Sequence, residues 1–242
     1  MIKIENIDVC GWEAAIRGAR NPMNSWDKSD SCWDWTREYP PISPDDDGWE
    51  YILGSNDLRL LMNLANAGPD HGKYLRMITV TVDLTAPLYW WKEFDTYKVG
   101  TVANSCSTMH KIHAKEFTMD DFSHDHLMDD GHIVDGGNCF LSPMDCLREQ
   151  VVTLNMCRNK FFEAKTKPMK EEAKRSESMK QWWWQMIQLL PSSYNQRRTV
   201  QLNYAVLKAM YHARKNHKLD EWHVLRDEIK ALPYFEKICL ED

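Results

Sequence analysis

Residues 189–235 constrain the fold more than any other part of this sequence, because they carry two amphipathic patterns in succession. The apolar residues of the first pattern are Leu202, Val206, Met210 and Ala213, and those of the second are Trp222, Leu225, Ile229 and Leu232. Spacings of three and four residues place side chains on one face of a helix. The polar residues 215–218 between the patterns, and Pro233 after them, predict two consecutive helices that each bury one face.

The same segment resembles the C-terminal region of the flavin-dependent thymidylate synthases, the ThyX family. The shared features are a Leu-Pro step, a tyrosine-bearing turn, an asparagine near the start of a helix, an arginine eleven residues later and a Glu-Trp pair in the next helix. Here they are Leu190-Pro191, Tyr194, Asn203, Arg214 and Glu221-Trp222. The resemblance is strongest in this segment and weaker through the middle of the chain.

A second stretch of resemblance lies where the family carries the signature R-H-R-x-x-S-x-N-E-x-S-x-R-Y. This chain reads Y-K-V-G-T-V-A-N-S-C-S-T-M-H from Tyr97 to His110. Asn104 and Ser107 agree with the signature, and Ser105 stands at the glutamate position. The opening R-H-R and the closing R-Y have no counterpart, so three arginines are lost. Because those cations hold flavin and nucleotide phosphates in the family, we expect flavin binding to be weak or absent.

The resemblance implies an α+β fold, a twisted β-sheet flanked by helices, in a single domain over residues 1–242. It implies an enzyme that transfers a one-carbon unit to dUMP from methylenetetrahydrofolate, with reducing equivalents from NADPH through FAD. Carbon 5 of uracil becomes nucleophilic when negative charge on the ring is stabilised. A guanidinium does this well, because it is always charged and forks to two acceptors. We expect Arg214 in this catalytic role.

By the same resemblance, a set of polar residues should surround the ligands. Those expected to bind the pyrimidine mononucleotide are Arg214, Ser105, Ser107, Tyr97 and Arg198, and those expected to bind the cofactor are Asn203, Lys98, Lys73 and Asn104. The family has a phosphate-binding arginine where this chain has Ile187, and Arg197 and Arg198 are close enough to substitute. An interval of eleven residues is about three helical turns, so Asn203 and Arg214 should line one pocket if both are helical.

Composition excludes several classes of protein. A net charge of −6 argues against gripping polymeric nucleic acid through its phosphates, although a mononucleotide needs only a few local cations. Seven cysteines without a C-x-x-C step indicate neither a zinc knuckle nor a disulfide framework. No apolar run is long enough to span a membrane, so we expect a cytoplasmic protein. The eleven tryptophans favour a buried core and a homo-oligomer, a tetramer as in the family, over a platform that stacks a base or flavin.

Two further segments are rich in polar side chains. Residues 117–138 are acidic and contain several histidines, but their spacing matches no defined metal motif, so we expect a solvated loop without a metal. Arg17 and Arg20 precede the turn at 21–25, where they either hold a phosphate or end a solvated helix. Cys106 is either a nucleophile toward a pyrimidine carbon or a buried apolar residue.

Three functions remain open from the sequence. The first is a divergent ThyX-like enzyme acting on a pyrimidine deoxynucleotide. The second is a nucleotide-binding paralogue that kept the pocket and lost the flavin. The third is a structural oligomer whose acidic segment 117–138 contacts other proteins.

Overall fold

The computed structural model describes residues 2–36, 48–131, 133–135, 138–166 and 172–241. The chain forms two compact units. Unit 1 comprises residues 1–3, 84–96 and 104–198, and unit 2 comprises residues 4–83, 97–103 and 199–242. The prediction of a single domain over the whole chain stays a prediction.

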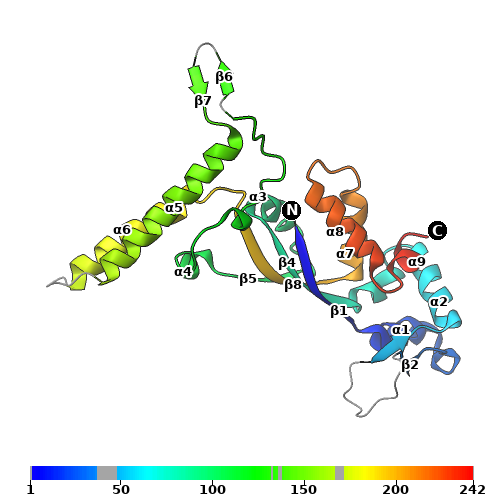
Figure 1. The fold of residues 1–242 in the computed structure, drawn as a ribbon. Helices are drawn as coiled ribbons and strands as arrows, with labels where there is room; N and C mark the ends of the chain where they lie inside the picture. Colours follow the sequence, from blue (N-terminus) through cyan, green and yellow to red (C-terminus); the bar gives the residue numbers. More distant parts are fainter. Residues whose placement is uncertain (1, 37–47, 132, 136–137, 167–171, 242) are drawn as a thin grey trace. The chain divides into compact units, whose positions relative to one another are not determined.

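The central sheet has four strands in the order β1-β4-β8-β5 (Figure 1). These are β1 (Lys3–Cys10), β4 (Thr79–Pro87), β8 (Asn195–Asn203) and β5 (Val102–Ser105). In β4 the residues Val80, Val82 and Leu84 are buried and alternate with half-buried neighbours, because successive side chains of a strand point to opposite faces. Together with the flanking helices, this sheet confirms the predicted α+β class.

Unit 2 contains the two helices that the 189–235 segment predicted and three others. They are α1 (Trp12–Arg20), α2 (Ser55–Asn66), α7 (Tyr204–Ala213), α8 (Asp220–Ala231) and α9 (Phe235–Cys239). Its core is aromatic: the rings of Trp12 and Tyr204 meet edge to face with centroids 5.4 Å apart, and Tyr204 and Phe235 meet similarly at 5.2 Å. Such pairs add to the stabilisation from buried area alone.

Unit 1 is built around two long helices, α5 (Pro143–Thr166) and α6 (Glu172–Leu189), which pack against each other. Shorter helices in this unit are α3 (Leu88–Phe94) and α4 (Thr108–Lys111). The residues buried around α5 and α6 include Phe117, Phe122, Leu154, Phe161 and Met186. Ser142 caps α5, because its Oγ accepts a hydrogen bond from the Asp145 amide at 3.0 Å.

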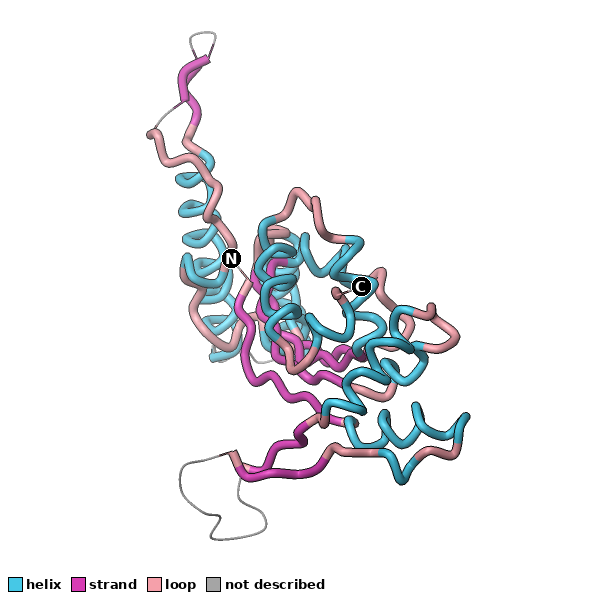
Figure 2. The backbone as a smooth tube through the Cα atoms, turned by 90° about the vertical axis from the view of Figure 1, so that its right-hand side faces the viewer, coloured by secondary structure: helices cyan, strands magenta, loops and turns pink. Residues whose placement is uncertain are grey.

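Four short strands form two separate antiparallel pairs. In unit 2, β2 (Cys32–Trp35) pairs with β3 (Trp49–Ile52). In unit 1, β6 (Ile133–Asp135) pairs with β7 (Asn138–Phe140) next to the start of α5 (Figure 2). Residues 37–47, between β2 and β3, lie outside the described part of the chain. Trp33 and Trp35 of β2 contact Tyr51 and Trp49 of β3 across the strand pair, which stabilises it.

The first amphipathic pattern of the 189–235 segment was assigned wrongly, and the second was assigned correctly. Strand β8 continues through Leu202, and α7 begins only at Tyr204. The residues that α7 buries are Tyr204, Leu207 and Met210, whereas Ala213 is exposed. By contrast, Trp222, Leu225, Ile229 and Leu232 are all buried as predicted. Across the described ranges, no helix is both long and apolar enough to cross a membrane.

Candidate functional site

Arg214 lies at the C-terminal end of α7, in unit 2, between two aromatic rings. Its Nε donates a hydrogen bond to the Tyr97 hydroxyl at 2.9 Å. Its Cζ lies 4.5 Å from the ring centroid of Trp222 and 5.3 Å from that of Tyr97. Trp222 itself is fully buried on α8. The guanidinium is therefore fixed in position by one directional hydrogen bond and two cation–π contacts.

The turn between α7 and α8 is held by its own hydrogen bonds. His217 Nδ1 accepts a hydrogen bond from the Leu219 amide at 3.1 Å, and His223 Nε2 lies 2.8 Å from the His217 carbonyl oxygen. The His217 ring also lies 6.0 Å from the Trp222 ring, between centroids. Because α8 buries Trp222, the fold places a permanent positive charge beside an aromatic surface. That combination suits a planar anionic ring or a phosphate.

Asn203 and Arg214 lie at opposite ends of α7, so the prediction that they line one pocket stays a prediction. Asn203 is the N-cap of α7, where its Oδ1 accepts a hydrogen bond from the Val206 amide at 3.1 Å, and Arg214 is the C-cap. The ten residues between them span about 15 Å along the helix axis. Gly100 lies against Asn203: a Cβ on this glycine would come within 2.9 Å of Asn203 Nδ2. Lys98, two residues before Gly100, is exposed.

Arg198 belongs to unit 1 and makes a different set of contacts. Its Nη1 lies 2.7 Å from Asp95 Oδ1, and its Nε donates to Gln196 Oε1 at 3.0 Å. Its Cζ also lies 4.1 Å above the Trp91 ring centroid. The guanidinium of Arg198 is bound by these residues of unit 1, and the predicted role of Arg198 in phosphate binding stays a prediction.

The other predicted residues of unit 1 lie in β5 and at the start of α4. Asn104 and Ser105 are exposed on β5. Ser107 is the N-cap of α4 and accepts a hydrogen bond from the His110 amide at 3.2 Å. Cys106 is exposed, so the expectation that it serves as a buried apolar residue is wrong; the strand pairing that continues to the Arg197 carbonyl leaves its side chain at the surface.

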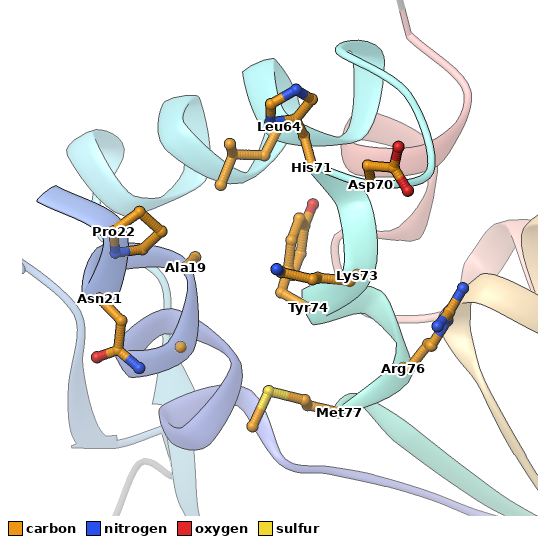
Figure 3. A pocket seen from close by; sticks show the side chains of 11 residues that line it. Ala19, Asn21, Pro22, Leu64, Asp70, His71, Lys73, Tyr74, Arg76 and Met77 are labelled. Atoms are coloured by element: carbon orange, nitrogen blue, oxygen red, sulfur yellow. The ribbon is translucent and has the colours of Figure 1, made fainter.

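Lys73 lines a cavity of about 480 Å³ in unit 2 (Figure 3). Two other basic residues, His71 and Arg76, also line it, together with the acidic Asp70 and several apolar side chains. In Figure 3, Lys73 extends toward Ala19 and the start of the turn after α1, whereas Arg76 extends to the other side. The lining residues of this cavity do not include Arg214, and the predicted role of Lys73 in cofactor binding stays a prediction.

Arg20, the last residue of α1, is held in a buried ion pair. Arg20 is only 5% exposed and is bound to Asp57, with Nε 2.6 Å from Asp57 Oδ1. Its Nη atoms donate to the carbonyl oxygens of Ser25 and Lys28. Arg20 therefore supports the fold instead of holding a phosphate. The sequence missed this role because Asp57 lies 37 positions away and no local pattern joins the two residues.

The residues at the family's R-H-R positions do not fit the flavin contacts that the resemblance implies. Tyr97 is hydrogen-bonded to Arg214, and Val99 is 89% exposed and offers no donor. Lys98 is the one cation of the three.

Within the described residues, no group of three His, Cys, Asp or Glu side chains is arranged to hold a metal ion, and His132 lies outside them.

No protein-family model matches the sequence, and no curated protein matches it. Solved structures do match the fold. A ThyX from Helicobacter pylori solved with FAD and dUMP has a TM-score of 0.60 at 14% identity, over 100% of this chain and 98% of that chain. A second H. pylori ThyX complex with FAD and dUMP gives 0.58 at 15% identity, over 98% of this chain and 99% of that chain.

The third comparison is a UMP/dUMP methylase, PolB, from Streptomyces cacaoi bound with 5-Br dUMP. Its TM-score is 0.56 at 13% identity, over 98% of this chain and 91% of that chain. The fold of this chain is therefore ThyX-like over its whole length, and the resemblance predicted from the sequence is confirmed at the level of the fold.

Proposed function

We propose that this protein binds a pyrimidine mononucleotide and transfers a one-carbon unit to dUMP, as a divergent thymidylate synthase. The observation that carries the proposal is the guanidinium of Arg214, fixed between Tyr97 and Trp222 in a chain of ThyX-like fold. The compared structures support the choice of ligand, because they were solved with dUMP or with 5-Br dUMP.

Arg214 would act on the pyrimidine ring by electrostatics. Placed against a ring oxygen or the adjacent nitrogen, the guanidinium stabilises negative charge there and so raises electron density at carbon 5. Tyr97 orients the guanidinium through its hydroxyl, which accepts the hydrogen bond from Arg214 Nε. Ser105, Ser107 and Arg198 remain proposed substrate contacts, and Lys73, Lys98, Asn104 and Asn203 remain proposed cofactor contacts.

Calorimetry with dUMP, UMP, dCMP and dTMP tests the binding step. We expect Arg214→Ala to weaken dUMP binding by about 2–5 kcal/mol, because a desolvated anionic group of the nucleotide would lose its positively charged partner. Arg214→Lys should recover little, since an ammonium cannot fork to two acceptors. Loss of tritium from carbon 5 of labelled dUMP, in the presence of methylenetetrahydrofolate, NADPH and added FAD, tests the transfer itself.

Arg226 provides a matched control in the same unit. Its Nε donates to the Tyr211 carbonyl oxygen at 2.9 Å, and its Cζ lies 4.3 Å above the Tyr211 ring. Arg226→Ala removes the same charge and a comparable cation–π contact, and should leave nucleotide binding unchanged. Equal binding by wild type and Arg214→Ala, or no binding of any nucleotide by the wild type below about millimolar concentration, would contradict the proposal.

A second candidate function is a nucleotide-binding protein that has lost the flavin. The altered segment 97–99 favours it, because each lost arginine removes charge-assisted hydrogen bonds of about 1.5–3 kcal/mol. Because weak flavin binding is expected, the protein should purify colourless under either function, and stoichiometric flavin bands would restore the complete flavin-dependent reaction. The absorption spectrum after addition of excess FAD separates the two functions: a shifted flavin spectrum supports the enzyme, and an unchanged one supports the nucleotide-binding protein.

A further inference from the structure

A second cavity in unit 2, of about 630 Å³, has walls made largely of aromatic rings. It lies where the β1–α1 junction, the β2–β3 pair and the start of α9 meet, and its aromatic lining residues are Trp12, Trp33, Trp49, Tyr51 and Tyr234. Its size falls in the range of pockets for small molecules. It contains neither Arg214 nor Lys73, so it is distinct from the sites described above.

The charges around this cavity are mainly negative. Asp8, Glu13 and Glu50 line it together with a single cation, Arg17. In the described part of the chain, the side-chain carboxylates of Glu13 and Glu50 form no hydrogen bond or ion pair. Burial raises the pKa of Tyr51, and the neighbouring charge of Glu13 raises it further. The negative charge of Glu13 therefore acts on Tyr51, one of the aromatic residues that line the cavity, and the Tyr51 phenol stays neutral.

The aromatic wall is held in place by the backbone and by ring contacts. Tyr234 has a positive φ of 56°, which is strained for a residue with a side chain. Its hydroxyl accepts a hydrogen bond from the Leu53 amide at 3.2 Å, and its ring packs edge to face on Trp12 at 5.5 Å between centroids. Trp33 and Tyr51 also meet edge to face, at 5.4 Å. Perpendicular rings present faces in two directions, as the walls of a cage do.

We propose that this cavity binds a small organic cation, an ammonium group substituted with methyl or other alkyl groups. The faces of tryptophan and tyrosine attract such cations, and the alkyl groups gain from contact with the rings. Three carboxylates against one guanidinium attract a cation and repel the phosphates of a nucleotide. A neutral apolar ligand would desolvate the carboxylates without compensation. The inference goes beyond the proposed function and does not depend on it.

Calorimetry on the full chain tests the proposal with two matched probes. The first is choline, and the second is its neutral carbon isostere, in which a tert-butyl group replaces the trimethylammonium. We expect choline to bind saturably with a dissociation constant of about 1 mM or tighter, and the isostere to bind at least about tenfold more weakly. The two ligands have the same shape, so a difference between them reports the charge.

Two variants locate the binding in this cavity. Glu13→Gln with Glu50→Gln keeps the shape and removes two charges, and Trp33→Leu removes one ring face; each should weaken choline binding about fivefold or more. Glu228→Gln and Trp184→Leu change exposed residues elsewhere and should have no effect. Circular dichroism checks that each variant folds. Equal affinity for the two probes, no saturable binding of choline up to about 10 mM, or unchanged binding in both cavity variants would overturn the proposal.

Discussion

At the scale of single residues, Asp57 illustrates how one buried charge can organise a whole loop. Asp57 is completely buried. Besides the ion pair with Arg20, its Oδ2 accepts hydrogen bonds from the hydroxyls of Ser29 and Ser31 at 2.7 Å each and from two backbone amides. A buried carboxylate is stable only when it is paired and hydrogen-bonded in this way. The segment between α1 and β2 therefore takes its conformation from a residue on α2.

The first prediction is that removing the charge of Asp57 destabilises unit 2. Asp57→Asn leaves Arg20 buried without its counter-ion and should lower the free energy of unfolding by about 3–5 kcal/mol. Urea unfolding followed by circular dichroism at neutral pH measures this loss. Asp129→Asn is the control, because Asp129 is half exposed in its ion pair with Arg148 and its loss should cost at most about 1 kcal/mol. Equal losses in the two variants would contradict the prediction.

The same residue gives an expected dependence on pH. Burial by itself would raise the pKa of Asp57, but hydrogen bonds from Ser29, Ser31 and Arg20 outweigh it, so the pKa is lowered. A carboxyl with a depressed pKa contributes stability above its unfolded pKa of about 4, and that contribution is lost as the pH falls through the folded value. The difference in stability between wild type and Asp57→Asn should therefore shrink on acidification below about pH 4.

At the scale of elements, the sequence predicted those helices whose buried face is continuous. The buried apolar residues Trp222, Leu225 and Ile229 of α8 lie three and four positions apart, so the helical period is unambiguous. The start of α7 could not be predicted in the same way. Val200 and Leu202 are buried at the spacing of a strand, and the helical spacing starts at Tyr204 without a break. Leu202 fits both periods, and only the hydrogen bond from the Val206 amide to Asn203 marks the boundary.

The candidate site was predictable only where the family resemblance supplied positions. The resemblance identified Tyr97 and Arg214 as two independent site residues. The fold joins them by a hydrogen bond although they are 117 positions apart in the sequence. It could not show that Trp222 forms the second ring against Arg214, or that Arg198 is bound to Asp95. Such contacts depend on tertiary packing, which no local pattern encodes.

The second prediction concerns the junction of β1 and α1, where a glycine allows a close backbone approach. Gly11 has a φ of 96°, and a Cβ at this position would lie only 2.1 Å from the Met77 carbonyl oxygen. Gly11→Ala should therefore cost about 3 kcal/mol or more, because backbone strain adds to a steric overlap with main chain. Gly68 also has a positive φ, of 104°, but open space surrounds its Cβ position.

Gly68→Ala is thus the matched control for the effect of φ alone, and should cost about 1–2 kcal/mol. Thermal and urea unfolding of the two variants measure the difference. If Gly11→Ala were no more destabilising than Gly68→Ala, the close approach to the end of the 3-10 helix Gly72–Arg76 would not constrain the fold.

At the scale of the whole molecule, unit 1 leaves apolar side chains at its surface. Val152 and Met156 are 62% and 51% exposed and lie four residues apart on α5, and Trp184 and Leu189 on α6 are about 40% exposed. Positions four residues apart share one face of a helix. Adjacent exposed apolar residues of this kind commonly mark a protein interface.

The last prediction is that the chain forms a homo-oligomer, a tetramer by the family resemblance, through this face of α5. Native mass spectrometry at micromolar concentration should give a mass several times that of the 28.5 kDa chain. Val152→Glu with Met156→Glu should shift the population to smaller species, because two charges would be desolvated in the interface. Val99→Glu alters an even more exposed apolar residue outside α5 and should leave the mass unchanged. A wild type that runs as a 28.5 kDa monomer would show that the exposed face of α5 does not mediate self-association. Binding sites shared between subunits would then be excluded, and Arg214 would have to bind its nucleotide within one chain.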